Sequence, residues 1–176
     1  MKTFKSIAMV LMMSMMFVAS AQTKKDKKIM KDAEKAKKEL VKVDPGLKKF
    51  FDDSAGYAIF PNVGKGGFII GGASGNGVLY QGGTAQGMAD LKKVDVGFQA
   101  GGQAIIEVLF FETDDDVTDF EEEKFQFSVN ISAVALKSGV SANAKYKDGV
   151  AVFTLPKSGL MAEASVGGQK FGYESF

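Results

Sequence analysis

Six lysines recur at alternating spacings of four and three residues, and the chemistry that they could perform is electrostatic. They are Lys24, Lys28, Lys31, Lys35, Lys38 and Lys42. We call them the lysine row, because this spacing places them on one face of an α-helix. An anionic membrane surface attracts each nearby lysine by roughly 1 kcal/mol, so six in line would favour docking. An ordinary solvated helix face would have the same pattern, and the residues alone leave both interpretations open.

A helix over residues 24–43 must position this row. Its apolar residues follow the same spacing on the opposite side, about 200° around the helix; they are Ile29, Ala33, Ala36, Leu40 and Val43. We therefore expect this stripe to pack on the rest of the protein. Asp44 is predicted to cap a second short helix with Pro45 at its first position. Leu47, Phe50 and Phe51 would form the buried face of that helix.

Residues for enzymatic chemistry are missing from the chain. It has no histidine and no cysteine, which removes the usual nucleophile pairs, the proton shuttle and thiolate or imidazole metal sites. The Lys-Ser neighbours at 137–138 and 157–158 fall in turn-like sequence. Gly64-Lys65-Gly66 lacks the spacing of a phosphate-binding loop. The sequence therefore predicts no enzyme, no cofactor and no nucleotide.

An acidic run between residues 112 and 123 offers many carboxylate oxygens. They belong to Glu112, Asp114, Asp115, Asp116, Asp119, Glu121, Glu122 and Glu123. The glycine and the terminal glutamate of a calcium-binding EF-hand loop are absent from the required positions. A solvated helical face is the favoured interpretation, with Thr113 as the cap of a helix over residues 114–123. No metal site is predicted.

Glu107 interrupts an otherwise apolar run over residues 104–111, which is long enough for a central strand. A buried carboxylate must be paired, hydrogen-bonded or neutralised. Glu107 could therefore be a polar contact inside a ligand cavity. Glu107 could also be a satisfied core charge or lie on a strand face turned to water, and these two interpretations are favoured over the cavity contact.

The rest of the chain has the alternation of short strands. Residues 125–133 alternate most clearly. Further strands are predicted over residues 94–100, 140–146, 150–155, 160–166 and 169–173. An Asp-Gly turn at 147–149 would join two of them. The fold class is mainly β (α+β): a curved antiparallel sheet or a closed barrel of about 8–10 short strands, with N-terminal helices and one short acidic helix.

Residues 1–21 have the pattern of a signal peptide, with cleavage expected after Ala21 and no cysteine for lipidation. The protein is thus predicted to be periplasmic or secreted. Residues 22–53 would form a lysine-rich helical region, and residues 54–176 a glycine-rich antiparallel β domain. Residues 22–49 have a net charge of +6 and the remainder of the processed chain −7, which suggests a partner for the basic end. Lysines without arginines argue against nucleic acid as that partner.

Four blocks in series resemble the SYLF domain, a lipid-binding family also described as actin-binding in fungi. They are DPGLKKFFDDSAGYAIFPNVGKGGFIIGG from Asp44, VGFQAGGQAIIEVLFFE from Val96, SAVALKSGVSANA from Ser132 and DGVAVFTLPKSGLMAEASVGGQKF from Asp148. The resemblance covers roughly residues 30–174. It implies association with phosphoinositides or other anionic lipids. The contacts it implies are the helical region, here residues 24–49, and a glycine-rich basic loop, here Lys65.

The leading hypothesis from these observations is a non-enzymatic lipid-binding protein of the cell envelope. It would dock on anionic phospholipid or a membrane surface through the lysine-rich helix and the loop of Lys65. A periplasmic protein does not ordinarily meet phosphoinositides, so another anionic lipid is expected. The alternative is a small outer-membrane β-barrel or a structural envelope scaffold without a ligand. The oligomeric state is not predicted.

Overall fold

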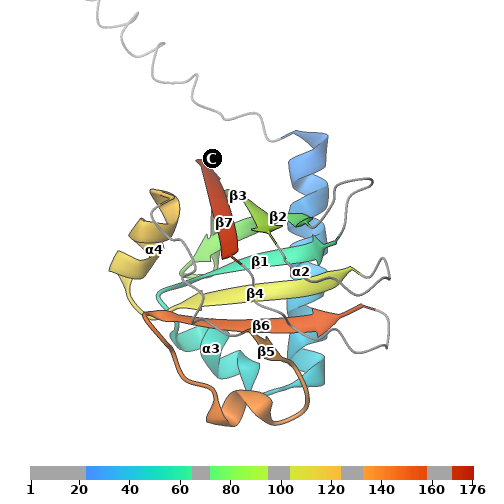
Figure 1. Cartoon of the computed structure of the whole chain (residues 1–176), viewed down its shortest axis with the longest axis vertical. Helices are drawn as coiled ribbons and strands as arrows, with labels where there is room; N and C mark the ends of the chain where they lie inside the picture. The colour runs from blue at the N-terminus through green and yellow to red at the C-terminus, as the bar shows by residue number, and fades with distance from the viewer. Residues whose placement is uncertain (1–22, 65–71, 95–103, 124–132, 158–167) are drawn as a thin grey trace, which may run out of the picture.

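A curved seven-stranded sheet is the centre of the fold (Figure 1). The computed structural model describes residues 23–64, 72–94, 104–123, 133–157 and 168–176. Its strands are β1 (Gly56–Val63), β2 (Gly72–Gln81), β3 (Thr84–Val94), β4 (Ile105–Phe111), β5 (Val134–Ala135), β6 (Val150–Pro156) and β7 (Gly168–Ser175). Their order is β5-β6-β4-β1-β2-β3-β7, with β5 and β7 as the edges. Of the two predicted forms, the described strands thus have the curved open one.

The centre of the sheet is formed by two strands that are apolar on both faces. β1 pairs with β2 and β4, and β4 pairs with β1 and β6, all antiparallel. Side chains that alternate along β4 therefore enter two different cores. Val108 and Phe110 face one core, whereas Leu109 and Phe111 face the other. The apolar run around Glu107 is a central strand, as predicted.

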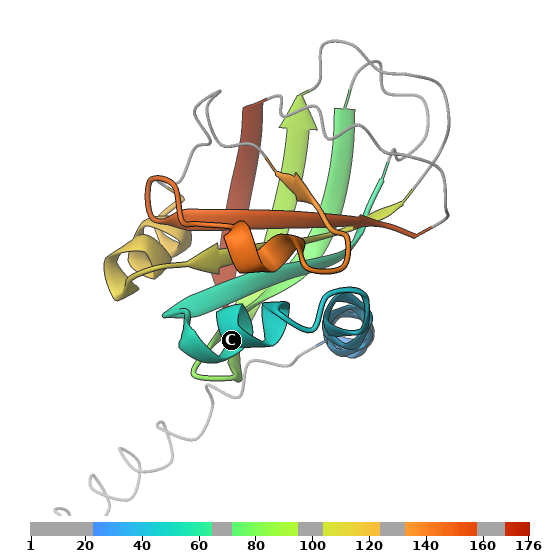
Figure 2. The ribbon, with the colours of Figure 1, turned by 90° about the horizontal axis from the view of Figure 1, so that it is seen from below.

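Helices cover both faces of this sheet (Figure 2). α2 (Lys24–Val43) and α3 (Leu47–Asp53) pack on one face, where Leu40 and Leu47 are fully buried. α4 (Asp114–Glu121) packs on the other face through Val117 and Phe120. None of the helices in the described ranges is long and apolar enough to cross a bilayer.

The bounds of α2 coincide with the predicted helix. The Thr23 side chain accepts a hydrogen bond from the Asp26 backbone N–H at 3.2 Å, and the Asp26 carboxylate accepts one from the Thr23 backbone N–H at 2.8 Å. These two bonds satisfy amide groups that a helix N-terminus leaves unpaired. Hydrogen bonds from the Thr23 side chain and backbone lower the pKa of Asp26. The same capping box joins Thr113 and Asp116 at the start of α4, as predicted for Thr113.

Asp44 bonds the turn that leads into α3 and has a further role beyond the predicted cap. It follows α2, and the assigned α3 begins only at Leu47, with no side-chain cap. The carboxylate of Asp44 is buried and accepts hydrogen bonds from the backbone N–H of Ser141 at 2.8 Å and of Gly46 at 3.0 Å. Burial alone would raise the pKa of Asp44, but the hydrogen bonds from Ser141 and Gly46 outweigh it, so the pKa lies below its ordinary value. Asp44 therefore ties the α2–α3 turn to a distant segment.

Replacing Asp44 with alanine is expected to cost about 2 kcal/mol of unfolding free energy, because the N–H of Ser141 loses a charged acceptor. A lowered folded-state pKa gives stability that is present above the unfolded value near 3.8 and is lost as the pH falls through the folded value. The difference in urea unfolding between the wild type and D44A should thus be largest at neutral pH and smaller at a pH below 3.8. Asp44→Asn, which does not titrate, is the control. An equal difference at both pH values would contradict this role.

Residues 140–146 do not form the predicted strand. Val140–Asn143 is a 3₁₀ helix that follows Gly139, whose φ is +79°. The N–H of Ser141 is taken by Asp44 and is not available for a strand pair. The turn at 147–149 is confirmed, since Lys147 and Val150 exchange two backbone hydrogen bonds of 2.9 and 3.1 Å.

One further expectation about the sheet needs revision. β5 pairs with β6 in parallel, so the sheet is mostly, not wholly, antiparallel. The described residues contain seven strands. The strands predicted over residues 94–100, 125–133 and 160–166 lie almost entirely outside the described residues. The predicted last strand is confirmed as β7, which pairs antiparallel with β3.

Candidate functional site

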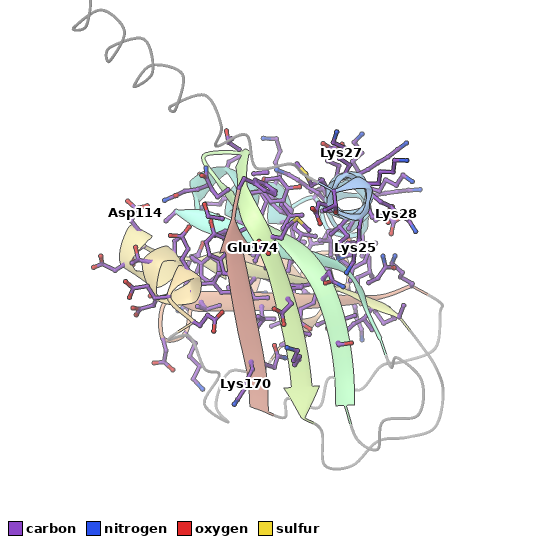
Figure 3. The ribbon with its side chains drawn as sticks, turned by 90° about the horizontal axis from the view of Figure 1, so that it is seen from above. Lys25, Lys27, Lys28, Asp114, Lys170 and Glu174 are labelled. Carbon is purple, nitrogen blue, oxygen red and sulfur yellow. The ribbon has the colours of Figure 1, made fainter. Side chains whose placement is uncertain are left out.

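The lysine row is exposed along its whole length. All six of its lysines are exposed, whereas Ala33, Ala36 and Leu40 on the other side of α2 are buried. Figure 3 looks along α2 and shows Lys27 and Lys28 pointing away from the sheet. Because α2 packs over β1 and β2, its orientation is set by the buried stripe. The predicted arrangement of lysines opposite an apolar stripe is confirmed.

Lys37 is a cation that the periodicity did not identify. It is half-buried, and its Nζ donates a hydrogen bond to the Tyr57 hydroxyl at 2.9 Å. The same Nζ lies 4.5 Å from the ring centroid of Phe51 and 4.7 Å from that of Tyr57. Such cation–π geometry holds a lysine in place at the cost of its rotamer freedom. The signal in the sequence was its spacing from Ala33 and Leu40, which puts Lys37 at the border of the apolar stripe.

A groove of about 560 Å³ lies between α2 and α3. Its lining combines charged and apolar side chains: Glu34, Lys37, Lys38, Val41, Lys42, Lys48, Phe51 and Asp52. We call it the α2–α3 groove. Phe51 is 7% exposed and packs edge-on against Tyr57 and Phe110, which places α3 on the sheet. The groove thus brings lysines of two helices together around one aromatic ring.

Comparison with known proteins finds a family similarity in the second half of the chain. Residues 92–174 match the family model described as Ysc84, Las17-binding protein actin regulator. The resemblance to the SYLF family is confirmed for this segment. The SYLF match runs from the end of β3 to β7. It therefore includes β4, α4 and β6, and the two helices that form the α2–α3 groove lie before it.

A second similarity covers more of the chain. "Beta cell expansion factor A" of Aeromonas veronii is 27% identical over 134 residues, which are 75% of this chain and 51% of that protein. This chain thus spans about half the length of that relative. The description of the matched family names binding to Las17 and regulation of actin, and it names no reaction.

The other predicted SYLF contact, Lys65, lies outside the described residues. Glu107 lies within them and is 0% exposed. It stands opposite Phe60 of β1 and Thr154 of β6, both also buried. The interpretation of Glu107 as part of a water-facing strand is therefore wrong. The other two interpretations of Glu107, a satisfied core charge and a polar contact in a ligand cavity, stay predictions.

The acidic run is a solvent-facing surface, as favoured from the sequence. Asp114, Asp115 and Asp119 on α4 are exposed, and Val117 and Phe120 form its buried side. No three acidic side chains among the described residues are grouped so that they could hold a metal ion. Asp114 lies on the opposite side of the molecule from Lys27 and Lys28 (Figure 3). The molecule thus carries its basic and acidic helices on opposite sides.

Proposed function

We propose that this protein is a non-enzymatic lipid-binding protein of the cell envelope that docks on anionic phospholipid through the lysine row. The observation that carries this proposal is six exposed lysines along one face of a helix whose other face is fixed to the sheet. A row held rigidly presents its charges together, without the cost of ordering the helix on binding. The SYLF resemblance, which implies anionic lipids, supports the same partner.

The distribution of charge supports one docking orientation. α2 contains nine lysines and four acidic residues, a net charge of +5. The acidic α4 is on the opposite side of the molecule (Figure 3). An anionic surface would therefore attract the α2 side and repel the α4 side at distances within the Debye length, roughly 10 Å at 0.1 M salt. The protein would approach the membrane with α2 first.

The burial of the apolar stripe determines how α2 would bind. Ala33 and Leu40 are 0% exposed, so they pack on the sheet and are not available for insertion between acyl chains. Amphipathic helices that insert bind through their buried apolar area, whereas a surface of lysines binds through charge. Docking through the lysine row should thus depend strongly on salt.

Co-sedimentation with vesicles tests this function. The processed protein, beginning at Gln22, should sediment with vesicles of phosphatidylcholine and phosphatidylglycerol but not with phosphatidylcholine alone. Raising the salt from about 0.1 M to about 1 M should release it, because the Debye length falls from about 10 Å to about 3 Å. Equal binding to both vesicles, or binding that salt leaves unchanged, would contradict docking by charge. The absence of binding to either would overturn the function.

The predicted compartment belongs to this proposal. The signal-peptide pattern of residues 1–21 supports a location in the periplasm or outside the cell. There the partner would be an anionic phospholipid other than a phosphoinositide. Lys65 would add a second cationic contact, and Glu107 is not needed for docking.

A further inference from the structure

The α2–α3 groove differs from the rest of the lysine row because apolar side chains line it together with lysines. Lys38 and Lys42 belong to both the row and the groove, whereas Lys31 and Lys35 belong to the row alone. Val41 and Phe51 line the groove beside these lysines, one half-buried and one buried. A charged rim around apolar side chains matches a ligand with both a charged and an apolar part.

Two lysines of the groove already have partners within the protein. Lys48 forms an ion pair with Asp52, and Lys37 is held by the Tyr57 hydroxyl and two aromatic rings. Lys38 and Lys42 are exposed and form no ion pair with any residue that the structure describes. They are four residues apart on α2, so their Cβ atoms are about 5–6 Å apart. Two long side chains at that separation can reach the oxygens of one phosphate.

We propose that the α2–α3 groove binds the phosphate and the adjoining glycerol of one anionic phospholipid in the docked membrane. Lys38 and Lys42 bind the phosphate oxygens, and Val41 and Phe51 contact the glycerol backbone and the first acyl carbons. Lys37 adds positive charge from a fixed position. This inference rests on the proposed function. It adds a defined lipid site to a surface that would otherwise bind only through its electrostatic potential.

Matched double variants distinguish lipid binding in the groove from general electrostatic attraction by the lysine row. K38A/K42A and K31A/K35A remove the same charge from the same exposed face of α2. If the lysines act only through the surface potential, each double variant should weaken binding to phosphatidylglycerol-containing vesicles by about 30-fold. If the groove binds one lipid, K38A/K42A should lose roughly another tenfold, because charged hydrogen bonds are lost as well.

A soluble lipid tests the site without a membrane surface. Dihexanoyl phosphatidylglycerol below its micelle concentration should shift the amide resonances of the groove residues in the wild type and in K31A/K35A, but not in K38A/K42A. Sodium phosphate at matched ionic strength should shift them much less, because it has no apolar part to contact Val41 and Phe51. The isosteric variant Val41→Thr, which keeps every charge, should weaken the lipid response several-fold.

The outcomes distinguish the two levels of the proposal. Vesicle binding by the wild type, with both double variants equally weakened and no shifts in the groove, would overturn the groove and leave the docking function standing. Shifts produced equally by sodium phosphate would also overturn a lipid site. No binding of the wild type to anionic vesicles would overturn the function and the groove together.

Discussion

Replacing Lys31, Lys35, Lys38 and Lys42 with glutamate is expected to abolish binding to anionic vesicles. All four side chains are exposed, whereas Ala33, Ala36 and Leu40 of the same helix are buried. Removing four attractions of roughly 1 kcal/mol each already weakens binding by about three orders of magnitude. The four new negative charges add repulsion. The measurement is co-sedimentation with vesicles that contain phosphatidylglycerol.

The same four substitutions should change the melting temperature only slightly. Glutamate and lysine have similar helix propensities, and neither the buried stripe nor the Thr23 capping box is touched. The carboxylate at position 42 opposes the dipole in the last turn of α2 and costs about 0.3–1 kcal/mol. For a protein of this size, that lowers the melting temperature by only a few degrees. A large drop in the melting temperature would mean that unfolding, not the loss of the lysines, explains the lost binding.

The control variant reverses four exposed lysines outside α2. Lys137, Lys145, Lys147 and Lys170 are exposed and lie outside α2. Their replacement by glutamate changes the net charge by the same amount. Vesicle binding should therefore weaken only modestly in this variant. An equal loss in both variants would show that net charge, not the lysine row, determines docking.

Phe110→Ala is expected to cost about 3–5 kcal/mol of unfolding free energy. Its ring is 0% exposed, and its centroid lies 5.3 Å from Phe50, 4.8 Å from Phe51 and 5.9 Å from Phe153. Truncation leaves a cavity at the point where α3 meets the sheet, and aromatic contacts are lost in addition to buried area. Since folded domains are stable by only about 5–15 kcal/mol, the loss should be plain in a urea unfolding curve.

Phe111→Ala is the matched control for the location of this effect. Phe111 is the next residue in β4, is equally buried, and faces α4 with its ring 5.1 Å from that of Phe120. Both variants should lose similar stability. Hydrogen exchange should accelerate in α2 and α3 for F110A but in α4 for F111A. The same local pattern in both variants would contradict two separate cores on the faces of the sheet.

Local periodicity was enough to predict the elements whose faces are set by their own residues. The four-and-three spacing gave the bounds of α2 and the exposed face of the lysine row. The apolar run gave β4 as a central strand, and Thr113 gave the start of α4. These signals lie within one segment, because the repeat of a helix or strand decides which side chains share a face. The second half of the chain also carried enough family signal for the SYLF resemblance.

The partner of each face was decided only by the tertiary structure. Residues 140–146 alternate like a strand, but the distant carboxylate of Asp44 takes the N–H of Ser141 and the segment turns instead. Glu107 is buried because β1 and β6 flank it, which its own run could not show. The role of Lys37 depends on the fold, which places the rings of Phe51 and Tyr57 against its amine.

The sequence by itself therefore determined the lysine row and the helix that presents it, since both follow from spacing along one segment. The α2–α3 groove was decided by the fold, because the packing of Phe51 on Phe110 and Tyr57 holds α3 beside Lys38 and Lys42. Periodicity specifies the direction in which a side chain points. Which distant residue it meets depends on long-range packing, which no single segment contains.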